Sequence, residues 1–141
     1  MSNNTTIDFP SILPNLRKAR LSFRILPNSG GHGTAFLVSV ETSELTASVE
    51  SSTSVKGPPS ILFKDIASNW RGWAGEKHWE DLDETVQLIA TCDRTGHVQL
   101  TVIFALYPYP KDHVRVSLSY EAGSLEQMSM LLSDLFDRHA T

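Results

Sequence analysis

Five carboxylates and three tryptophans fall within residues 70–84 and form the densest group of chemically capable side chains in this chain. The acidic residues are Glu76, Glu80, Asp81, Asp83 and Glu84, and the tryptophans are Trp70, Trp73 and Trp79. With one lysine, residues 76–84 carry a net charge of −4, which equals that of the whole chain because the other 11 acidic and 11 basic residues cancel. Catalytic carboxylates need surroundings that shift their pKa, whereas clustered acids are typical of a solvated face. We therefore predict a recognition surface here and no catalytic carboxylate.

The familiar enzyme motifs are missing from the sequence. It holds neither glycine-rich nucleotide-binding pattern, no Gly-x-Ser-x-Gly and no His-Glu-x-x-His. None of the five histidines has another at ligand spacing, and we interpret His32 and His97 as polar residues of equivalent turns. The single cysteine, Cys92, excludes an intramolecular disulfide and a cysteine-rich zinc site, and its alternation with Ala90 favours a small buried hydrophobe over a nucleophile. We predict a non-enzymatic protein with no cofactor and no metal.

Composition narrows the class of protein further. A chain of 141 residues with 40% hydrophobic and 20% charged residues is typical of a single globular domain. A net charge of −4 argues against nonspecific nucleic-acid binding, which needs a basic surface. The N-terminal residues lack the pattern of a signal peptide, and no apolar run approaches the roughly 18 residues of a spanning helix. We expect a cytoplasmic protein that binds neither nucleic acid nor membrane.

Hydrophobic periodicity predicts the elements of the first half. Residues 1–15 are polar, contain two prolines and are interpreted as a flexible N-terminal arm. Period-two alternation predicts strands over 19–25, 36–40 and 45–49. A helix should begin at Ser60 and bury one face, formed by Leu62, Ile66, Trp70 and Trp73.

The second half repeats this scheme. Alternation predicts strands over 86–92, 98–106 and 114–120, and a capping pattern predicts a final helix after Ser124. Its buried face should hold Leu125, Met128, Leu132 and Leu135. We predict one α+β domain over 16–141, with strand-strand-strand-helix halves at 17–75 and 84–139. Together the halves should form one antiparallel sheet of about six strands, with two helices packed on one face.

This scheme divides the tryptophans into two groups. Trp70 and Trp73 are assigned a structural role on the helix face, with Gly72 and Gly75 permitting a sharp turn after it. Trp79 lies beyond the turn, beside the acids, and exposed tryptophans are favoured at protein interfaces. The predicted partner-binding surface is Glu76, Trp79, Glu80, Asp81, Asp83 and Glu84.

Three motifs in order resemble a family of small uncharacterised bacterial proteins. They are a Trp-x-Gly-Trp-x-Gly-x-x-x-Trp pattern ending at Trp79, the segment Asp93-Arg-Thr-Gly-His-Val98 and the segment Glu121-Ala-Gly123. The resemblance covers roughly residues 60–135, and the family brings no established activity. Small acidic proteins of this kind resemble the immunity proteins that neutralise toxins in bacterial competition. That likeness transfers no site residues.

Three functions remain open from the sequence. The first is a protein-binding module, in particular an immunity protein whose acidic, aromatic surface occludes a cognate toxin with a basic surface. The second is a small-molecule-binding or enzymatic domain with a pocket between sheet and helices, to which His78, Asp93 and His97 would contribute polar groups. The third is a structural homodimer, so the sequence leaves both a monomer and a homodimer open.

Overall fold

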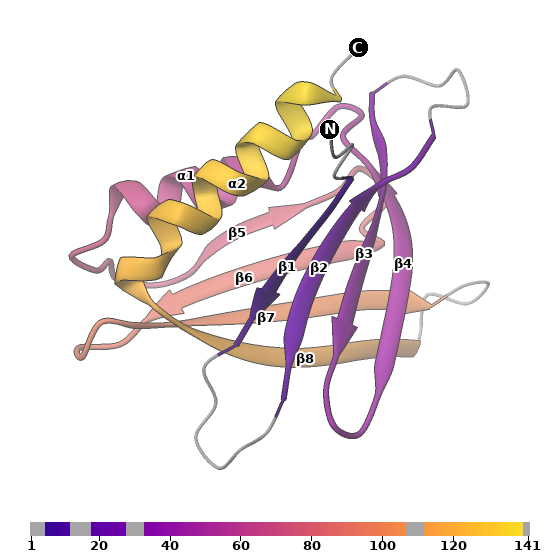
Figure 1. Ribbon diagram of the computed structural model, residues 1–141. Coiled ribbons are helices and arrows are strands. Elements are labelled where there is room, and N and C mark those ends of the chain that lie inside the picture. The colour runs from indigo at the N-terminus through magenta and orange to yellow at the C-terminus, as the bar shows by residue number, and fades with distance from the viewer. Residues whose placement is uncertain (1–4, 12–17, 28–32, 107–111, 140–141) are drawn as a thin grey trace.

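Two antiparallel sheets, each followed by a helix, make up the fold (Figure 1). The computed structural model describes residues 5–11, 18–27, 33–106 and 112–139. The first sheet has the order β1-β2-β3-β4, and the second has the order β5-β6-β7-β8. The strands are β1 (Thr6–Pro10), β2 (Arg20–Ile25), β3 (Ala35–Glu41), β4 (Thr46–Ser52), β5 (Lys77–Glu80), β6 (Val86–Cys92), β7 (His97–Leu106) and β8 (Asp112–Glu121). The helices are α1 (Ser60–Ser68), the single turn η2 (Ala122–Ser124) and α2 (Leu125–Arg138).

The α+β class and the repetition of strands followed by a helix are as predicted, but the single six-stranded sheet is wrong. Within the described residues the strands form two four-stranded sheets. The sequence pattern missed the first strand of each sheet. β1 lies in a polar segment with two prolines, and β5 has only four residues. The arm predicted over 1–15 is accordingly wrong for Thr6–Pro10, which pairs with β2; residues 1–4 and 12–15 lie outside the described part.

The core lies between the two sheets, whose strands run across one another in Figure 1. Each sheet is apolar on one face, and the two apolar faces cover each other. The predicted alternation holds within strands: Leu21 and Phe23 of β2 and Leu88 of β6 are completely buried. The sheets also meet at two corners. Ser11, just after β1, bonds to Ser119 of β8, and the hydroxyl of Ser51 on β4 donates to Asp81 after β5.

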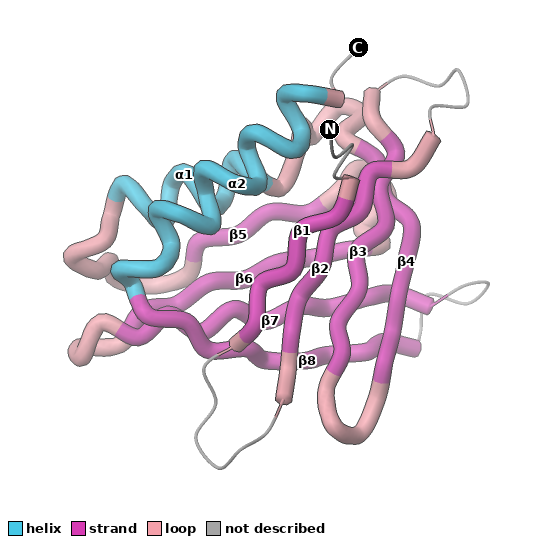
Figure 2. The backbone as a smooth tube through the Cα atoms, viewed as in Figure 1, coloured by secondary structure: helices cyan, strands magenta, loops and turns pink. Residues whose placement is uncertain are grey.

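The two helices pack against each other along one side of the sheets (Figure 2). There α1 contacts β5 and α2 contacts β1, each an outer strand of its sheet. The predicted buried face of α2 is confirmed, since Leu125, Met128, Leu132 and Leu135 are all buried. In the part of the chain that the structure describes, no helix has the length and apolarity to cross a membrane.

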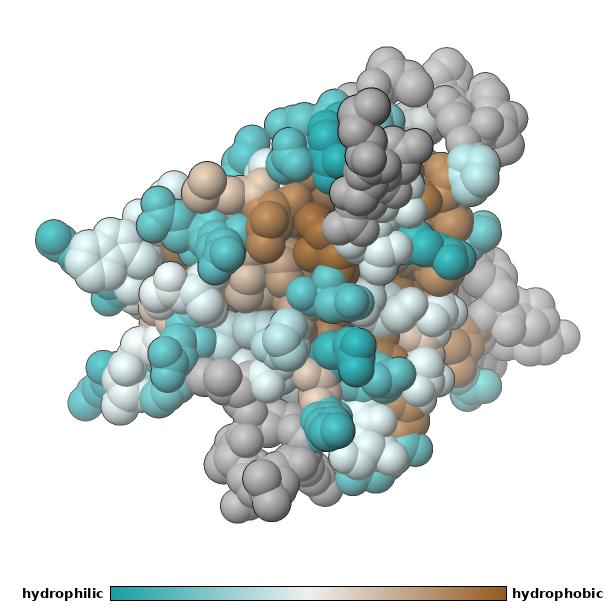
Figure 3. Space-filling view, viewed as in Figure 1, coloured by the Kyte–Doolittle hydropathy of each residue, from teal (hydrophilic) through white to brown (hydrophobic). Residues whose placement is uncertain are grey.

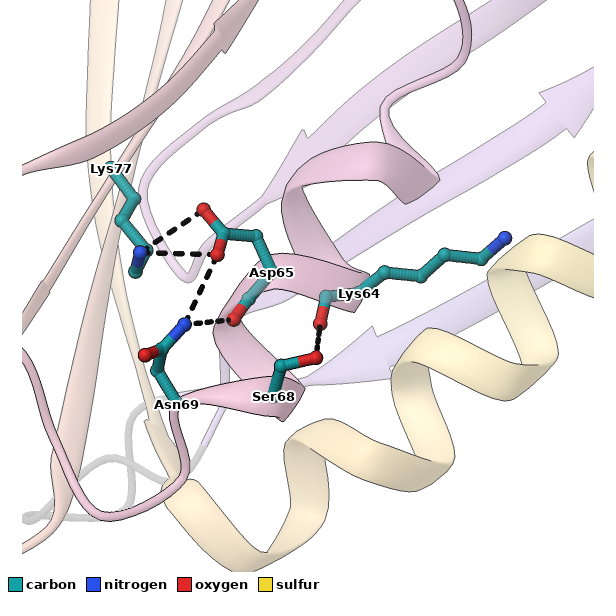
Figure 4. Close-up of polar contacts among 5 residues, drawn as sticks. All are labelled: Lys64, Asp65, Ser68, Asn69 and Lys77. Carbon is teal, nitrogen blue, oxygen red and sulfur yellow. Dashed lines mark hydrogen bonds and ion pairs between the residues drawn. The ribbon is translucent and has the colours of Figure 1, made fainter.

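The first helix ends earlier than its apolar periodicity suggests. Its last residue is Ser68, and Asn69 has left the helical conformation. The Asn69 side-chain amide donates to the backbone oxygen of Asp65 at 2.8 Å and to its carboxylate at 3.1 Å (Figure 4). Trp70 therefore lies beyond the helix and is 59% exposed, so its predicted place on the buried face is wrong.

Candidate functional site

The structure moves Trp79 from the predicted surface into the interior. Its position on β5 opposite Leu88 directs the side chain to the inner face, where it is only 6% exposed. The indole N–H donates to the backbone oxygen of Gly57 at 3.3 Å, and the ring lies 6.3 Å from that of Phe36. Trp79 joins the second sheet to the first, so its assignment to a partner-binding surface is wrong.

Trp70 and Trp73 lie in the loop that joins α1 to β5. The guanidinium of Arg71 lies 4.9 Å from the centre of the exposed Trp70 ring. Trp73 is half-buried and packs against the core. Gly72 and Gly75 both have positive φ, 108° and 79°, a conformation that an L side chain rarely adopts. The loop thus exposes one tryptophan and inserts the next.

A small polar network fixes the start of β5 against α1 (Figure 4). The ammonium of Lys77 lies 3.0 Å from the Oδ2 of Asp65 and 3.1 Å from its Oδ1, and this Oδ1 also accepts from the Asn69 side chain. The same ammonium lies 5.6 Å from the centre of the Trp73 ring. Lys77, whose side chain is 20% exposed, is therefore a structural cation that anchors the tryptophan loop.

Asp81 is the buried carboxylate of the acidic segment, with 5% of its surface exposed. Its carboxylate oxygens accept from the Ser51 hydroxyl at 2.6 Å, from the Thr85 amide at 2.7 Å and from the Val86 amide at 3.3 Å. Burying a charge without such partners would be strongly unfavourable. Asp81 closes the turn between β5 and β6 and ties it to β4, so its assignment to the partner surface is wrong.

The residues that Asp81 holds in place are exposed. Leu82 is 51% exposed, and Asp83 and Glu84 are exposed beside it. Glu84 has a φ of 56°, uncommon for a residue other than glycine. We call Leu82–Glu84 the acidic turn. It combines one apolar side chain with two carboxylates on a backbone that a buried carboxylate fixes.

The other predicted acids are divided between the two ends of β5. Glu80 is half-buried and lies opposite Gln87, next to the acidic turn. Glu76 is exposed but precedes β5, at the end occupied by the tryptophan loop. The continuous acidic, aromatic patch of the sequence prediction is therefore replaced by two separate features, an exposed Trp70 at one end and the acidic turn at the other.

A hollow of about 130 Å³ adjoins the acidic turn. It is lined by Asp83, Glu84, Thr85, Gln87, Ala105, Leu106 and His113. Leu106, at the end of β7, is 37% exposed and adds a second apolar side chain to this region. Sequence reasoning missed Leu82 and Leu106, because only the fold exposes them beside the carboxylates.

Of the polar residues considered for an enzymatic site, Asp93 and His97 lie together in a turn, and His78 lies apart from them on β5. Asp93 accepts hydrogen bonds from Thr95 and from the His97 amide within the turn between β6 and β7. The bond from the Thr95 side chain, followed by that from the His97 backbone, lowers the pKa of Asp93 to about 2. His78 is exposed on β5, and His32 lies outside the described residues.

Cys92 is half-buried at the end of β6, and its thiol donates to the Asp93 oxygen at 3.4 Å. Among the described residues, no three histidine, cysteine, aspartate or glutamate side chains form a group able to hold a metal ion. The residues that sequence reasoning could offer for catalysis thus occupy a turn and a strand surface.

The fold and the candidate site define a small α+β protein of two sheets. Its buried Asp81 carboxylate fixes the turn that exposes the carboxylates of Asp83 and Glu84. The chain belongs to a family of unknown function (DUF6228), whose model matches residues 13–139. A search of curated proteins gave no match. The family match extends well beyond the 60–135 segment that carried the resemblance.

Proposed function

We propose that this protein is a non-catalytic binding module whose acidic turn docks on a basic surface of a protein partner. The observation that carries the proposal is the buried Asp81 carboxylate, which holds Leu82, Asp83 and Glu84 exposed on a fixed backbone. Ordering a loop on binding costs free energy, so a turn fixed beforehand binds more tightly. An apolar centre with a polar rim is also the usual anatomy of an interface.

The partner chemistry follows from the charges. Two carboxylates beside Leu82 would speed association with a basic surface and disfavour acidic ones. Glu80 lies at the same end of β5 and would extend this charge. A toxin neutralised by this protein, as in the immunity systems that the chain resembles, is the partner that we propose.

The experiment measures association with the product of the neighbouring gene by surface plasmon resonance. The double variant Asp83→Lys with Glu84→Lys should lower the association rate constant about ten-fold at low ionic strength. The control variant Glu50→Lys with Glu126→Lys makes the same change of net charge on β4 and α2, where both residues are exposed. It should change the rate by less than about three-fold. Equal effects of the two variants would show that net charge alone matters and would contradict the proposed site.

A further inference from the structure

A second concave surface shares no lining residue with the hollow beside the acidic turn. It is a groove of about 330 Å³ between β1, the end of β8 and the first half of α2. Phe9, Tyr120, Met128 and Leu131 give it an apolar lining, and Asp8 and Glu121 add carboxylates. Figure 3 shows apolar side chains gathered where α2 lies beside β1. None of these residues belongs to the predicted partner surface.

The floor of the groove is fixed by bonds between the two sheets. The Tyr120 hydroxyl donates to the backbone oxygen of Phe9 at 2.9 Å, and burial raises the pKa of Tyr120, which keeps this donor protonated. The Ser119 amide donates to the Ser11 hydroxyl at 2.8 Å, and that hydroxyl donates back to the Ser119 oxygen at 3.0 Å. The Phe9 ring lies 5.8 Å from that of Phe63 on α1. The groove is therefore formed before any ligand arrives.

One wall of the groove is the outer edge of β1, which faces away from β2. The Ile25 amide donates to the Thr5 oxygen, and the Ser11 amide donates to the Ala19 oxygen. Because ladder bonds in an antiparallel pair occur at every second residue, the backbone N–H and C=O of Asp8 point away from β2. Because Asp8 lines the groove, its C=O is a hydrogen-bond acceptor on this wall. Pro10 follows two residues later and has no N–H, which disfavours pairing with an added strand.

The charge of the groove favours a cation. Both exposed charged side chains that line it, Asp8 and Glu121, are acidic, and no lysine, arginine or histidine is among its described lining residues. The Ser22 hydroxyl on β2 donates to the Asp8 carboxylate. The N-terminus of α2 carries a partial positive charge that opposes a cation, and Glu126 in its first turn offsets this.

We propose that this groove binds a small organic ammonium ion with an apolar body. The ammonium group would donate to the Asp8 carboxylate or backbone oxygen and to Glu121, while the apolar body would pack on Met128 and Leu131. The volume lies at the lower end of the roughly 300–1,000 Å³ of small-molecule sites, which suits a ligand of about ten non-hydrogen atoms. This proposal is independent of the acidic turn.

Titration of the full chain with butylammonium, phenethylammonium and tryptammonium, followed by NMR amide shifts, tests the site. At least one probe should give saturable shifts at β1 and α2, with a dissociation constant on the order of 1 mM. The neutral 2-phenylethanol and the anionic 3-phenylpropionate should bind at least about five-fold more weakly than phenethylammonium. Raising the salt concentration should weaken the ammonium probes.

Two exposed neighbours on α2 provide matched variants. Leu131, which is 45% exposed, lines the groove, whereas Met130, which is 67% exposed, does not. Leu131→Lys places a tethered ammonium at the groove and should weaken binding at least ten-fold, while Met130→Lys should change it less than about two-fold. Asp8→Asn and Glu121→Gln should each weaken binding about two- to five-fold.

Three results would overturn the proposal: no saturable shift with any ammonium probe, equal binding of phenethylammonium and 2-phenylethanol, or equal effects of the two lysine variants. The variant Asp83→Lys with Glu84→Lys should leave probe binding unchanged, because the acidic turn does not line the groove. Failure of the groove and failure of the protein-binding proposal are thus distinguishable.

Discussion

Replacing Asp81 with alanine should destabilise this protein far more than any other loss of a carboxylate in the acidic segment. The variant removes two short bonds, from Ser51 at 2.6 Å and Thr85 at 2.7 Å, and a longer one from Val86 at 3.3 Å. A hydrogen bond to a charged group contributes about 1.5–3 kcal/mol, and an unpaired buried amide costs about 1–3 kcal/mol. Part of this is offset because the variant no longer buries a charge. We expect the free energy of unfolding to fall by about 2–4 kcal/mol.

Urea unfolding followed by circular dichroism measures this change, and the melting temperature should fall by about 6–12 °C in a chain of this length. Asp81→Asn should lose less, because its amide oxygen still accepts from Thr85 and its N–H can donate to Ser51. The matched control is Asp83→Ala, two residues away and exposed, which should change stability by less than about 0.5 kcal/mol. An Asp81→Ala variant within about 0.5 kcal/mol of the Asp83→Ala control would refute the reasoning.

Three further predictions test the interior, a turn and a titration. Trp79→Ala should destabilise by about 3–5 kcal/mol and Trp70→Ala by less than 1 kcal/mol; equal losses in denaturant unfolding would contradict their assigned burial. Gly33→Ala should lower the melting temperature clearly more than Gly75→Ala. Both glycines have positive φ, but a Cβ at Gly33 would lie 2.8 Å from neighbouring atoms, whereas a Cβ at Gly75 would meet open space. The Asp93 carboxyl should titrate near pH 2 when followed by NMR. Because its pKa is lower in the folded state, the stability that it contributes should be complete above about pH 4 and lost as the pH falls towards 2. A titration midpoint near 3.8 would contradict this prediction.

Local pattern was sufficient for much of the architecture. Leu21 and Phe23, and likewise Val86 and Leu88, are separated by one polar residue. This alternation predicted which side chains point inward, because a strand in a two-layer fold is buried on one face. The helical spacing from Leu125 to Leu135 predicted the buried face of α2 in the same way. Such periodicities are properties of a single element and need no knowledge of its neighbours.

The placement of the tryptophans and carboxylates depended on pairing. Trp79 is buried because β5 pairs with β6, and the short segment Lys77–Glu80 gave no sign of that pairing. Trp70 is exposed because Asn69 and Asp65 end α1 one turn before the apolar spacing does. The sequence therefore assigned Trp70 to the buried face and Trp79 to the surface, and the structure reverses both assignments.

The sequence by itself determined the class of the fold, the repetition of strands followed by a helix, the absence of familiar enzyme motifs and the concentration of acidic residues in one segment. Tertiary structure alone decided that Asp81 is a structural carboxylate while Asp83 and Glu84 stay exposed. The physical reason is that a carboxylate can be buried only where donors converge on it, and here Ser51 comes from the other sheet. A contact between residues thirty positions apart leaves no trace in local composition, yet it separates the acids that hold the turn from those that can meet a partner.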